Sequence, residues 1–174
     1  MTLNAETKEQ FTGLILLTGV DRPGISAALF ESLAPFAVSI IDVEQIVISD
    51  RLILTVLIAL NPSHQKAIET DLEQCAANND VDIATLFENR QLIPVKDALV
   101  DVVISAAKMH PATLASVSKT LKELGANIES ISRTDSTNTS ILLTVSNSNH
   151  ADVDAALSAL SFEDGSAILT KVQS

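Results

Sequence analysis

The sequence predicts an α+β protein built from two copies of one βαββαβ unit. Aliphatic and β-branched runs, typical of strands, alternate along the 174 residues with segments of helical periodicity. The order strand, helix, strand, strand, helix, strand occurs twice, and the two copies superpose on each other. A unit of this order and size folds as a four-stranded antiparallel sheet with both helices on one face, which is the ferredoxin-like arrangement.

The repeat rests on apolar and proline positions that coincide when the chain is laid over itself. No gap is needed from the proline of each copy to the middle of the following strand. The coinciding pairs are Pro23 and Pro111, Leu29 and Val117, Leu33 and Leu121, Ile40 and Ile128, and Val43 and Ile131. A slip of one residue at a turn then aligns Leu54-Thr55-Val56 with Leu143-Thr144-Val145. Two copies of one unit explain these coincidences better than chance does.

Each element of the first copy has a local signal. We expect strands over residues 14–18, 38–49, 51–60 and 81–87, a helix over 23–37 and a second helix ending near residues 78–79. Asn61 or Ser63, beside Pro62, is expected to cap the second helix. A tight turn at Ser49 and Asp50 makes a hairpin of two β-branched runs. The inward faces of the two helices carry Ile25, Ala28, Leu29, Leu33 and Phe36, and Ala67, Ile68, Leu72 and Cys75.

The second copy has the same pieces. We expect strands over 100–106, 127–134, 141–146 and 167–172, with helices over 111–124 and 151–160. Gly125 is expected to end the first of these helices, because glycine is common just past a helix end. A short linker around residues 89–97, which contains Pro94, separates the copies. We therefore place the first domain at residues 11–89 and the second at 98–174, and we expect the two to be closely apposed.

One strand is apolar on both of its faces. Along residues 51–60, the side chains of Leu52, Leu54, Val56 and Leu60 point one way, and those of Ile53, Leu57 and Ala59 point the other. One face of such a sheet is usually polar, because water wets it. We therefore expect a further sheet from the same or another chain to cover the second face. We predict a homodimer, with Leu52, Leu54 and Val56 on the face that is too apolar for water.

Composition excludes several classes of partner. The formal net charge of −11 repels phosphate backbones, and no local cluster of Lys and Arg reverses it, so we expect no nucleic-acid partner. Residues 1–10 lack the apolar core of a signal peptide, and no apolar run is long enough to span a membrane. The single Cys75 cannot form an internal disulfide and shares a helical stripe with apolar residues. We expect a soluble, cytoplasmic chain with a buried structural thiol.

The histidines do not suggest a metal site. His64, His110 and His150 are too far apart in the repeat, and we expect them to be exposed to solvent. Lys108 and Arg133 are interpreted as ordinary surface charges. We therefore expect no cofactor or metal in this chain.

The most informative stretch is Thr18-Gly19-Val20-Asp21-Arg22-Pro23-Gly24-Ile25, where a strand ends in a polar turn that opens a helix. We place Pro23 at the first helical position, where proline is favoured. Because Gly24 has no side chain, the free N–H groups of the first turn lie bare for a small carboxylate. A well-formed helix start without a ligand is the alternative, but a better helix former would then be favoured. Asp21, Arg22, Pro23 and Gly24 are candidate ligand-binding residues.

Together with Val38-Ser39-Ile40-Ile41-Asp42-Val43-Glu44-Gln45-Ile46-Val47-Ile48, this motif resembles the ACT domain, a small-molecule-binding regulatory module of amino-acid metabolism. With Ala27-Ala28-Leu29-Phe30-Glu31 it resembles, more narrowly, the paired ACT domains that precede the catalytic domain of bacterial phosphoserine phosphatases, especially the actinobacterial type. The resemblance is strong over residues 14–60 and fair over 99–146. It implies a regulatory region of L-serine biosynthesis that binds an amino acid, with L-serine favoured, and transmits its occupancy through a dimer interface.

The resemblance also implies where the ligand lies. Serine-binding ACT domains hold it between two units, where the loop of one meets an asparagine on the second strand of the other. Asn127 matches that asparagine, whereas the first copy has Ser39 there, and Met109-His110-Pro111-Ala112 replaces the loop in the second copy. The expected composite pocket combines Asp21 and Gly24 with Asn127, and a weaker second site combines His110 with Ser39. Asp42 and Gln45 either line the same interface or serve in strand pairing.

The catalytic domain of those phosphatases requires a D-x-D pair at the end of an apolar strand, where both carboxylates hold Mg²⁺. Asp80-Val81-Asp82 and Asp152-Val153-Asp154 do not follow apolar strands, and Asp152 suits the start of a helix. We expect no catalytic residues, no hydrolysis of phosphoserine by this chain, and Mg²⁺ only in a catalytic domain that this chain lacks. The alternatives are a stand-alone double ACT protein resembling the glycine-cleavage repressor, which acts through protein–protein contact, and a purely structural dimerisation module.

Overall fold

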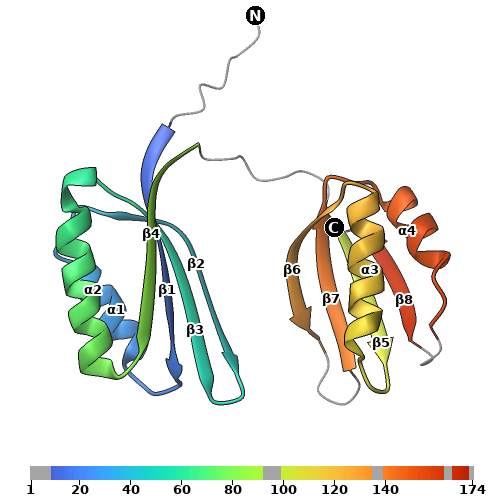
Figure 1. The fold of residues 1–174 in the computed structure, drawn as a ribbon, viewed down its shortest axis with the longest axis horizontal. Helices are drawn as coiled ribbons and strands as arrows, with labels where there is room; N and C mark the ends of the chain where they lie inside the picture. Colours follow the sequence, from blue (N-terminus) through green and yellow to red (C-terminus); the bar gives the residue numbers. More distant parts are fainter. Residues whose placement is uncertain (1–8, 92–98, 135–138, 163–165, 173–174) are drawn as a thin grey trace, which may run out of the picture. The chain divides into compact units, whose positions relative to one another are not determined.

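Each half of the chain contains a four-stranded antiparallel sheet with two helices packed on one of its faces (Figure 1). The computed structural model describes residues 9–91, 99–134, 139–162 and 166–172. The chain divides into two units, Met1–Ile93 and Pro94–Ser174. The α+β class and the ferredoxin-like βαββαβ order are thereby confirmed in both copies.

The first unit has the strand order β2-β3-β1-β4 across its sheet. Its elements are β1 (Glu9–Val20), α1 (Ile25–Leu33), β2 (Ser39–Ile48), β3 (Arg51–Ala59), the short η1 (Pro62–His64), α2 (Gln65–Asn79) and β4 (Asp82–Gln91). β1 is longer than expected because it is a central strand, paired with β3 on one side and with β4 on the other. Residues 89–91, expected in the linker, continue β4 because they pair with the start of β1. Residues 92–98, with Pro94, lie outside the described part.

The second unit repeats this topology with the strand order β6-β7-β5-β8. Its elements are β5 (Val100–Ala106), α3 (Pro111–Glu123), β6 (Asn127–Arg133), β7 (Thr139–Ser146), α4 (His150–Ser158) and β8 (Ala167–Val172). Gly125 adopts φ 73°, and the amides of Gly125 and Ala126 donate to the carbonyls of Lys122 and Leu121. These two bonds are the Schellman motif, which confirms that α3 stops before Gly125.

The repeat is present in the structure, but the predicted alignment of its third strands is wrong. Val43 pairs with Val56 in the first unit, and its equivalent Ile131 pairs with Leu143 in the second. Leu143 therefore corresponds to Val56 and not to Leu54. A shift of two residues leaves every side chain on the same face of a strand, so the apolar pattern alone cannot distinguish the two alignments.

Each unit has its own apolar core between the sheet and the helices. The buried side chains of the first core are Ile15, Leu17, Ile25, Leu29, Leu33, Leu52, Leu54, Val56, Ile58, Leu60, Ile68 and Leu72. Those of the second are Val100, Val102, Ile104, Val117, Leu121, Leu143, Val145, Val153 and Leu157. The helical stripes are confirmed, with Cys75 buried in α2. Ala67 is exposed instead, because it lies about a quarter turn from Ile68 around the helix.

The structure reverses which face of the first sheet needs a cover. Leu52, Leu54 and Val56 belong to the core beneath the helices, so the prediction that they form the uncovered face is wrong. The opposite face carries the other apolar set of β3 with neighbours from β1, β2 and β4. Its apolar residues are Leu14, Leu16, Ile46, Ile48, Ile53, Leu57 and Leu86. Leu16 and Leu86 are 39% and 55% exposed, so this face is open in the single unit.

Two local predictions are also corrected. α1 ends at Leu33 and does not reach residue 37, because Pro35 has no N–H with which to continue the helix. His64 and His150 are half-buried, and only His110 is exposed. The His64 ring packs against Phe36 with ring centroids 6.1 Å apart, which removes it from solvent.

Gly19 lies where β1 passes close to Val81. A Cβ atom on Gly19 would lie 2.6 Å from Val81 Cγ1 and 3.2 Å from Val81 Cβ. Because valine is stiff, we expect Gly19→Ala to lower the free energy of unfolding by about 1–3 kcal/mol, the usual cost of overpacking. Denaturant unfolding measures this change. Gly19→Ala combined with Val81→Ala should cost less than the sum of the two single changes, whereas simple additivity would show that the side chains do not meet.

Candidate functional site

The loop over residues 21–24 joins the end of β1 to the start of α1, and two hydrogen bonds hold it in place. The Asp21 amide donates to the Asp50 carbonyl over 2.8 Å, which ties the loop to the β2–β3 turn. Arg22 Nη2 donates to the Asn79 carbonyl at the end of α2, where a guanidinium also meets the negative end of the helix dipole. Arg22 therefore positions the loop against α2.

The start of α1 differs from the prediction. Gly24 is the N-cap, with φ 96° and ψ −14°, and the helix begins at Ile25. Pro23 precedes the cap, so its predicted place at the first helical position is wrong. The left-handed conformation explains the glycine, because a side chain is disfavoured at positive φ. No side chain caps α1, so the N–H groups of its first turn are left for a ligand or water.

In the structure, Gln45 lies beside this helix start, whereas Asp42 does not. Ser26 Oγ, in the first turn of α1, donates to Gln45 Oε1 over 2.6 Å. Sequence analysis did not select Ser26, although its place two residues after Gly24 was a usable signal. Asp42 pairs with Leu57 on the face opposite the helices, and its Oδ1 accepts from the Val43 amide over 2.9 Å. Gln45 thus belongs to the candidate site, whereas Asp42 serves the local geometry of β2.

The equivalent loop of the second unit is closed by its own residues. α3 starts at Pro111, with His110 as N-cap in an extended conformation. His110 Nδ1 accepts from the Ala112 amide over 3.1 Å, and the Thr113 amide donates to the His110 carbonyl. The His110 side chain thus accepts from an N–H group at the start of α3, whereas no side chain does so at the start of α1. The two copies differ at the helix start while they share the core.

Ser39 and Asn127 occupy equivalent places at the starts of β2 and β6. Each unit has a β-bulge shortly after, between Ile40 and Asp42 in the first and between Ile128 and Ser130 in the second. Asn127 Nδ2 donates to Glu129 Oε1 over 2.7 Å. Asn127 and His110 belong to the second unit, whereas Ser39 and the loop belong to the first. Both composite sites therefore stay predictions.

A hollow of about 520 Å³ lies beside the loop, at the end of the first sheet, and sequence analysis missed it. Its lining residues are Thr18, Gly19, Val20, Arg51, Ala76, Ala77, Asp80, Val81 and Asp82. They come from β1, β3, β4 and the end of α2, which only the tertiary fold brings together. The available signals were the D-x-D triplet at residues 80–82 and an arginine that directly follows a tight turn.

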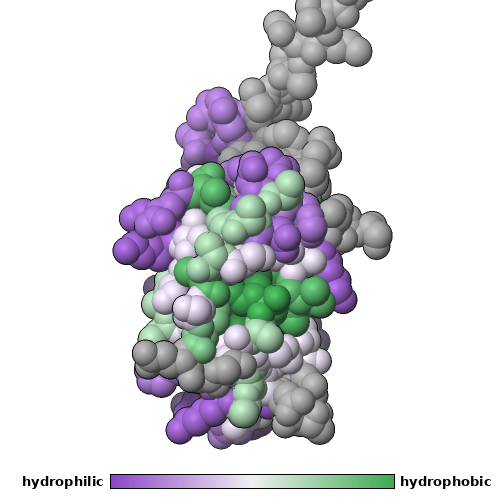
Figure 2. All heavy atoms as spheres, turned by 90° about the vertical axis from the view of Figure 1, so that its right-hand side faces the viewer, coloured by the Kyte–Doolittle hydropathy of each residue, from purple (hydrophilic) through white to green (hydrophobic). Residues whose placement is uncertain are grey.

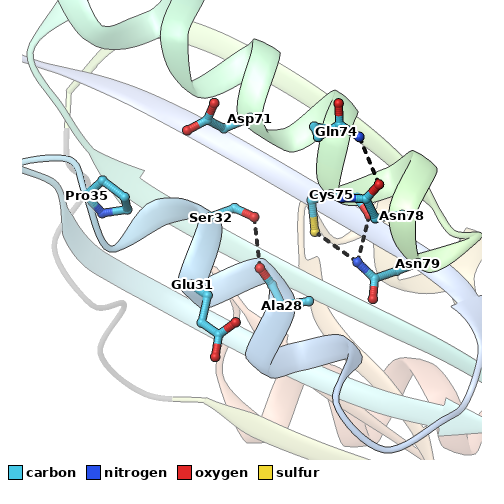
Figure 3. A pocket seen from close by; sticks show the side chains of 9 residues that line it. All are labelled: Ala28, Glu31, Ser32, Pro35, Asp71, Gln74, Cys75, Asn78 and Asn79. Carbon is cyan, nitrogen blue, oxygen red and sulfur yellow. Dashed lines mark hydrogen bonds between the residues drawn. The ribbon is translucent and has the colours of Figure 1, made fainter.

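Two further hollows are weaker candidates for a ligand site. A groove of about 430 Å³ between α1 and α2 has a mostly polar lining (Figure 3), but Ser32, Gln74 and Asn79 form their hydrogen bonds within their own helices. In the second unit, a hollow of about 510 Å³ is lined by Lys108 and His110 together with Ser161 and Phe162. Lys108 is exposed and lies close to the helix start of α3.

The two D-x-D triplets have structural positions. Asp80 ends α2 at φ 50°, and Asp82 begins β4. Asn149 Oδ1 accepts from the Asp152 amide and Asn149 Nδ2 donates to Asp152 Oδ2, which confirms Asp152 in the first turn of α4. Among the residues that the structure describes, no three His, Cys, Asp or Glu side chains gather to hold a metal ion. In the same ranges, no helix has both the length and the apolar character needed to cross a membrane.

Comparison with known proteins identifies the first half of the chain. Residues 12–85 match a family model described as an ACT domain. The first unit is an ACT domain. Because the second unit repeats its strand order and helix positions, the chain has a tandem ACT-type fold.

The chain is similar in sequence to two bacterial phosphoserine phosphatases. Over 122 residues it is 31% identical to phosphoserine phosphatase SerB2 of Mycobacterium tuberculosis. The aligned segment makes up 68% of this chain and 29% of that protein. Over 68 residues it is 38% identical to phosphoserine phosphatase of Streptomyces coelicolor. The aligned segment makes up 39% of this chain and 16% of that protein. The chain thus spans less than a third of the length of these curated relatives.

Solved structures show the same fold over nearly the whole chain. A protein assigned as a glycine cleavage system transcriptional repressor matches with a TM-score of 0.73 and 19% identity, over 94% of this chain and 99% of that one. A protein of unknown function from Galdieria sulphuraria matches with a TM-score of 0.68 and 19% identity, over 96% and 100%. At this level of identity the likeness concerns the fold alone.

The left-handed conformation of Gly24 changes what a substitution there should do. An added Cβ has no atom within 4 Å, so the cost is conformational and not steric against neighbours. We expect Gly24→Val to lower the free energy of unfolding by about 1–2 kcal/mol, since β-branched residues resist positive φ. Gly24→Asn should cost clearly less, because asparagine tolerates this region. Denaturant unfolding of the two variants checks this, and equal costs would contradict a left-handed cap.

Proposed function

We propose that this tandem ACT chain is an amino-acid receptor, with L-serine as its ligand, and that it regulates a phosphoserine phosphatase. Sequence similarity to the regulatory regions of two phosphoserine phosphatases supports the physiological context. One structural observation carries the assignment of the site. α1 starts at a left-handed glycine with no side-chain cap, whereas His110 caps the corresponding helix of the second unit.

The chemistry of the helix start suits the carboxylate of an amino acid. Free N–H groups at a helix N-terminus point at an anion, and the helix dipole favours negative charge there. Gly24 is exposed and carries no Cβ, so a ligand can approach the backbone closely. Gln45 stands next to the first turn through its bond with Ser26, and its amide nitrogen can donate to the same carboxylate. Asp21, three residues before Gly24, is an acceptor for the ligand ammonium.

A second candidate function is a stand-alone regulator that acts by contact with another protein. The protein assigned as a glycine cleavage repressor has the same fold over 94% of this chain, so this architecture is compatible with such a role. The two functions differ in one property. The receptor requires saturable binding of an amino acid, whereas a purely protein-binding module does not.

L-serine should bind the chain saturably, with shifts of the backbone amide resonances of Gly24, Ile25 and Ser26 in an NMR titration. Gln45→Ala should weaken this binding by about fivefold, the worth of one polar contact. Ala112→Val, in the closed loop of the second unit, should leave it unchanged because His110 already occupies that amide. Asn127→Ala tests the composite pocket by the same readout. If the shifts depend on Ala112 and not on Gln45, the ligand site belongs to the second unit.

We also propose that the receptor acts as a homodimer through the open face of the first sheet. That face gathers the apolar residues Leu14, Leu16, Ile46, Ile48, Ile53, Leu57 and Leu86, and no helix or strand in the described part of the first unit covers it. An apolar surface of this kind marks an interface in a soluble protein. This face also carries the charged Asp42 and Glu44 of β2, and the corresponding face of the second unit carries Asp101 and Lys171 between its apolar positions. On the side of that unit drawn in Figure 2, hydrophobic surface forms a central band between hydrophilic regions.

The chain should have the mass of a dimer by light scattering at micromolar concentration. Leu86→Asp should shift it to the monomer, because a carboxylate on the open face opposes its burial. Ile131→Asp is the matched control, since Ile131 is 56% exposed, like Leu86 at 55%, but lies on the helix side of the second sheet. Dissociation by Ile131→Asp alone would place the interface elsewhere.

A further inference from the structure

We propose that the hollow at the end of the first sheet is a binding site for a small zwitterion, such as a free amino acid, separate from the helix start of α1. The hollow has a volume of about 520 Å³, which lies within the usual range of small-molecule sites. It is built entirely from residues of the first unit. Its distinguishing feature is one guanidinium and two carboxylates that line the same space.

The charges of the hollow are not paired with one another. Among the residues that the structure describes, the side chain of Arg51 forms no hydrogen bond or ion pair, and neither do those of Asp80 and Asp82. All three are exposed at the rim, so a ligand from solvent can reach them. Opposite charges that share a hollow without contact can be bridged by a molecule that carries both signs.

Strand pairing sets the separation of these groups. Arg51, the first residue of β3, pairs with Val20, and Asp82, the first residue of β4, pairs with Thr18 on the other side of β1. β1 thus stands between the cation and the carboxylate. Figure 1 shows that α2 ends at the end of the sheet where β1 ends and β4 begins. The Val81 amide donates to the Ala76 carbonyl, and this bond holds Asp80 at that end of the sheet.

The electrostatics give the ligand a direction. An arginine fork matches a carboxylate with two parallel hydrogen bonds, so the ligand carboxylate faces Arg51. Asp80 and Asp82 lie at the end of α2, whose dipole is negative there, and this end favours the ligand ammonium. The other cation nearby, Arg22, already donates to the Asn79 carbonyl. The walls between the charges are small and apolar at Ala76, Ala77 and Val81, which suits a short side chain.

A glycine is among the residues that line the hollow. Gly19 is buried and lines the hollow, and a Cβ there would meet Val81 at 2.6 Å. This close approach brings β1 and the start of β4 together beneath the ligand. Gly19 and Val81, which meet at this contact, both line the hollow.

Amide NMR titration of the full chain with glycine and with L-serine tests this site independently of the helix start. We expect saturable shifts at the amides of Gly19 and Asp82. N-acetyl-L-serine, which lacks the ammonium, and L-serinamide, which lacks the carboxylate, should each bind there at least about tenfold more weakly, as expected for the loss of a charged partner. Shifts confined to residues 24–26 would support the proposed function and overturn this second site.

Two substitutions each remove one charge from the hollow. Arg51→Gln and Asp82→Asn should each weaken the shifts at Gly19 by at least about tenfold. Arg90→Gln and Glu88→Gln are matched controls on β4 outside the hollow, and they should change the affinity less than about twofold. Thermal unfolding verifies that all four variants are folded. Wild-type affinity in Arg51→Gln and Asp82→Asn, or no binding of either amino acid at Gly19, would refute the proposal.

Discussion

The packing of two helices onto one face of a sheet with a doubly paired central strand determines the rest of this structure. In the first unit, β1 pairs with β3 and β4, and its inward residues Ile15 and Leu17 are fully buried beneath the helices. A strand held on both sides and on one face has little freedom at its end. The loop after Val20 therefore emerges at a defined place, between the β2–β3 turn and the end of α2. Both candidate sites lie around this point.

The two copies share the positions of their cores but differ in how the first helix of each unit starts. Leu29 and Val117 occupy equivalent core positions, and both are fully buried. At the helix start, however, the left-handed Gly24 has Ala112 as its counterpart, and alanine is disfavoured at positive φ. The second copy begins its helix at Pro111 and satisfies the Ala112 amide with His110. One glycine thus separates an open helix start from a closed one.

The open face of the first sheet and the hollow at its end differ in what they require. The open face is apolar and extended, so burial against another apolar surface is its favourable outcome. The hollow is small and carries both signs of charge, so it favours a ligand that satisfies them in pairs. A regulatory module needs both kinds of surface, because a ligand can alter an assembly only where its occupancy is linked to an interface.

The sequence by itself determined the order of elements, the repeat, the stop of α3 at Gly125 and the candidate loop at residues 21–24. These features depend on neighbours a few positions apart, through helical periodicity and turn chemistry. Only the tertiary structure decided which face of β3 is covered, because alternation marks two faces and does not say which one the helices choose. The tertiary structure also brings Ser26 into contact with Gln45 and places Arg51 and Asp82 around one hollow. Those residues are distant in sequence. The packing of α1 on the sheet places Ser26 beside Gln45, and strand pairing places Arg51 and Asp82 on either side of β1.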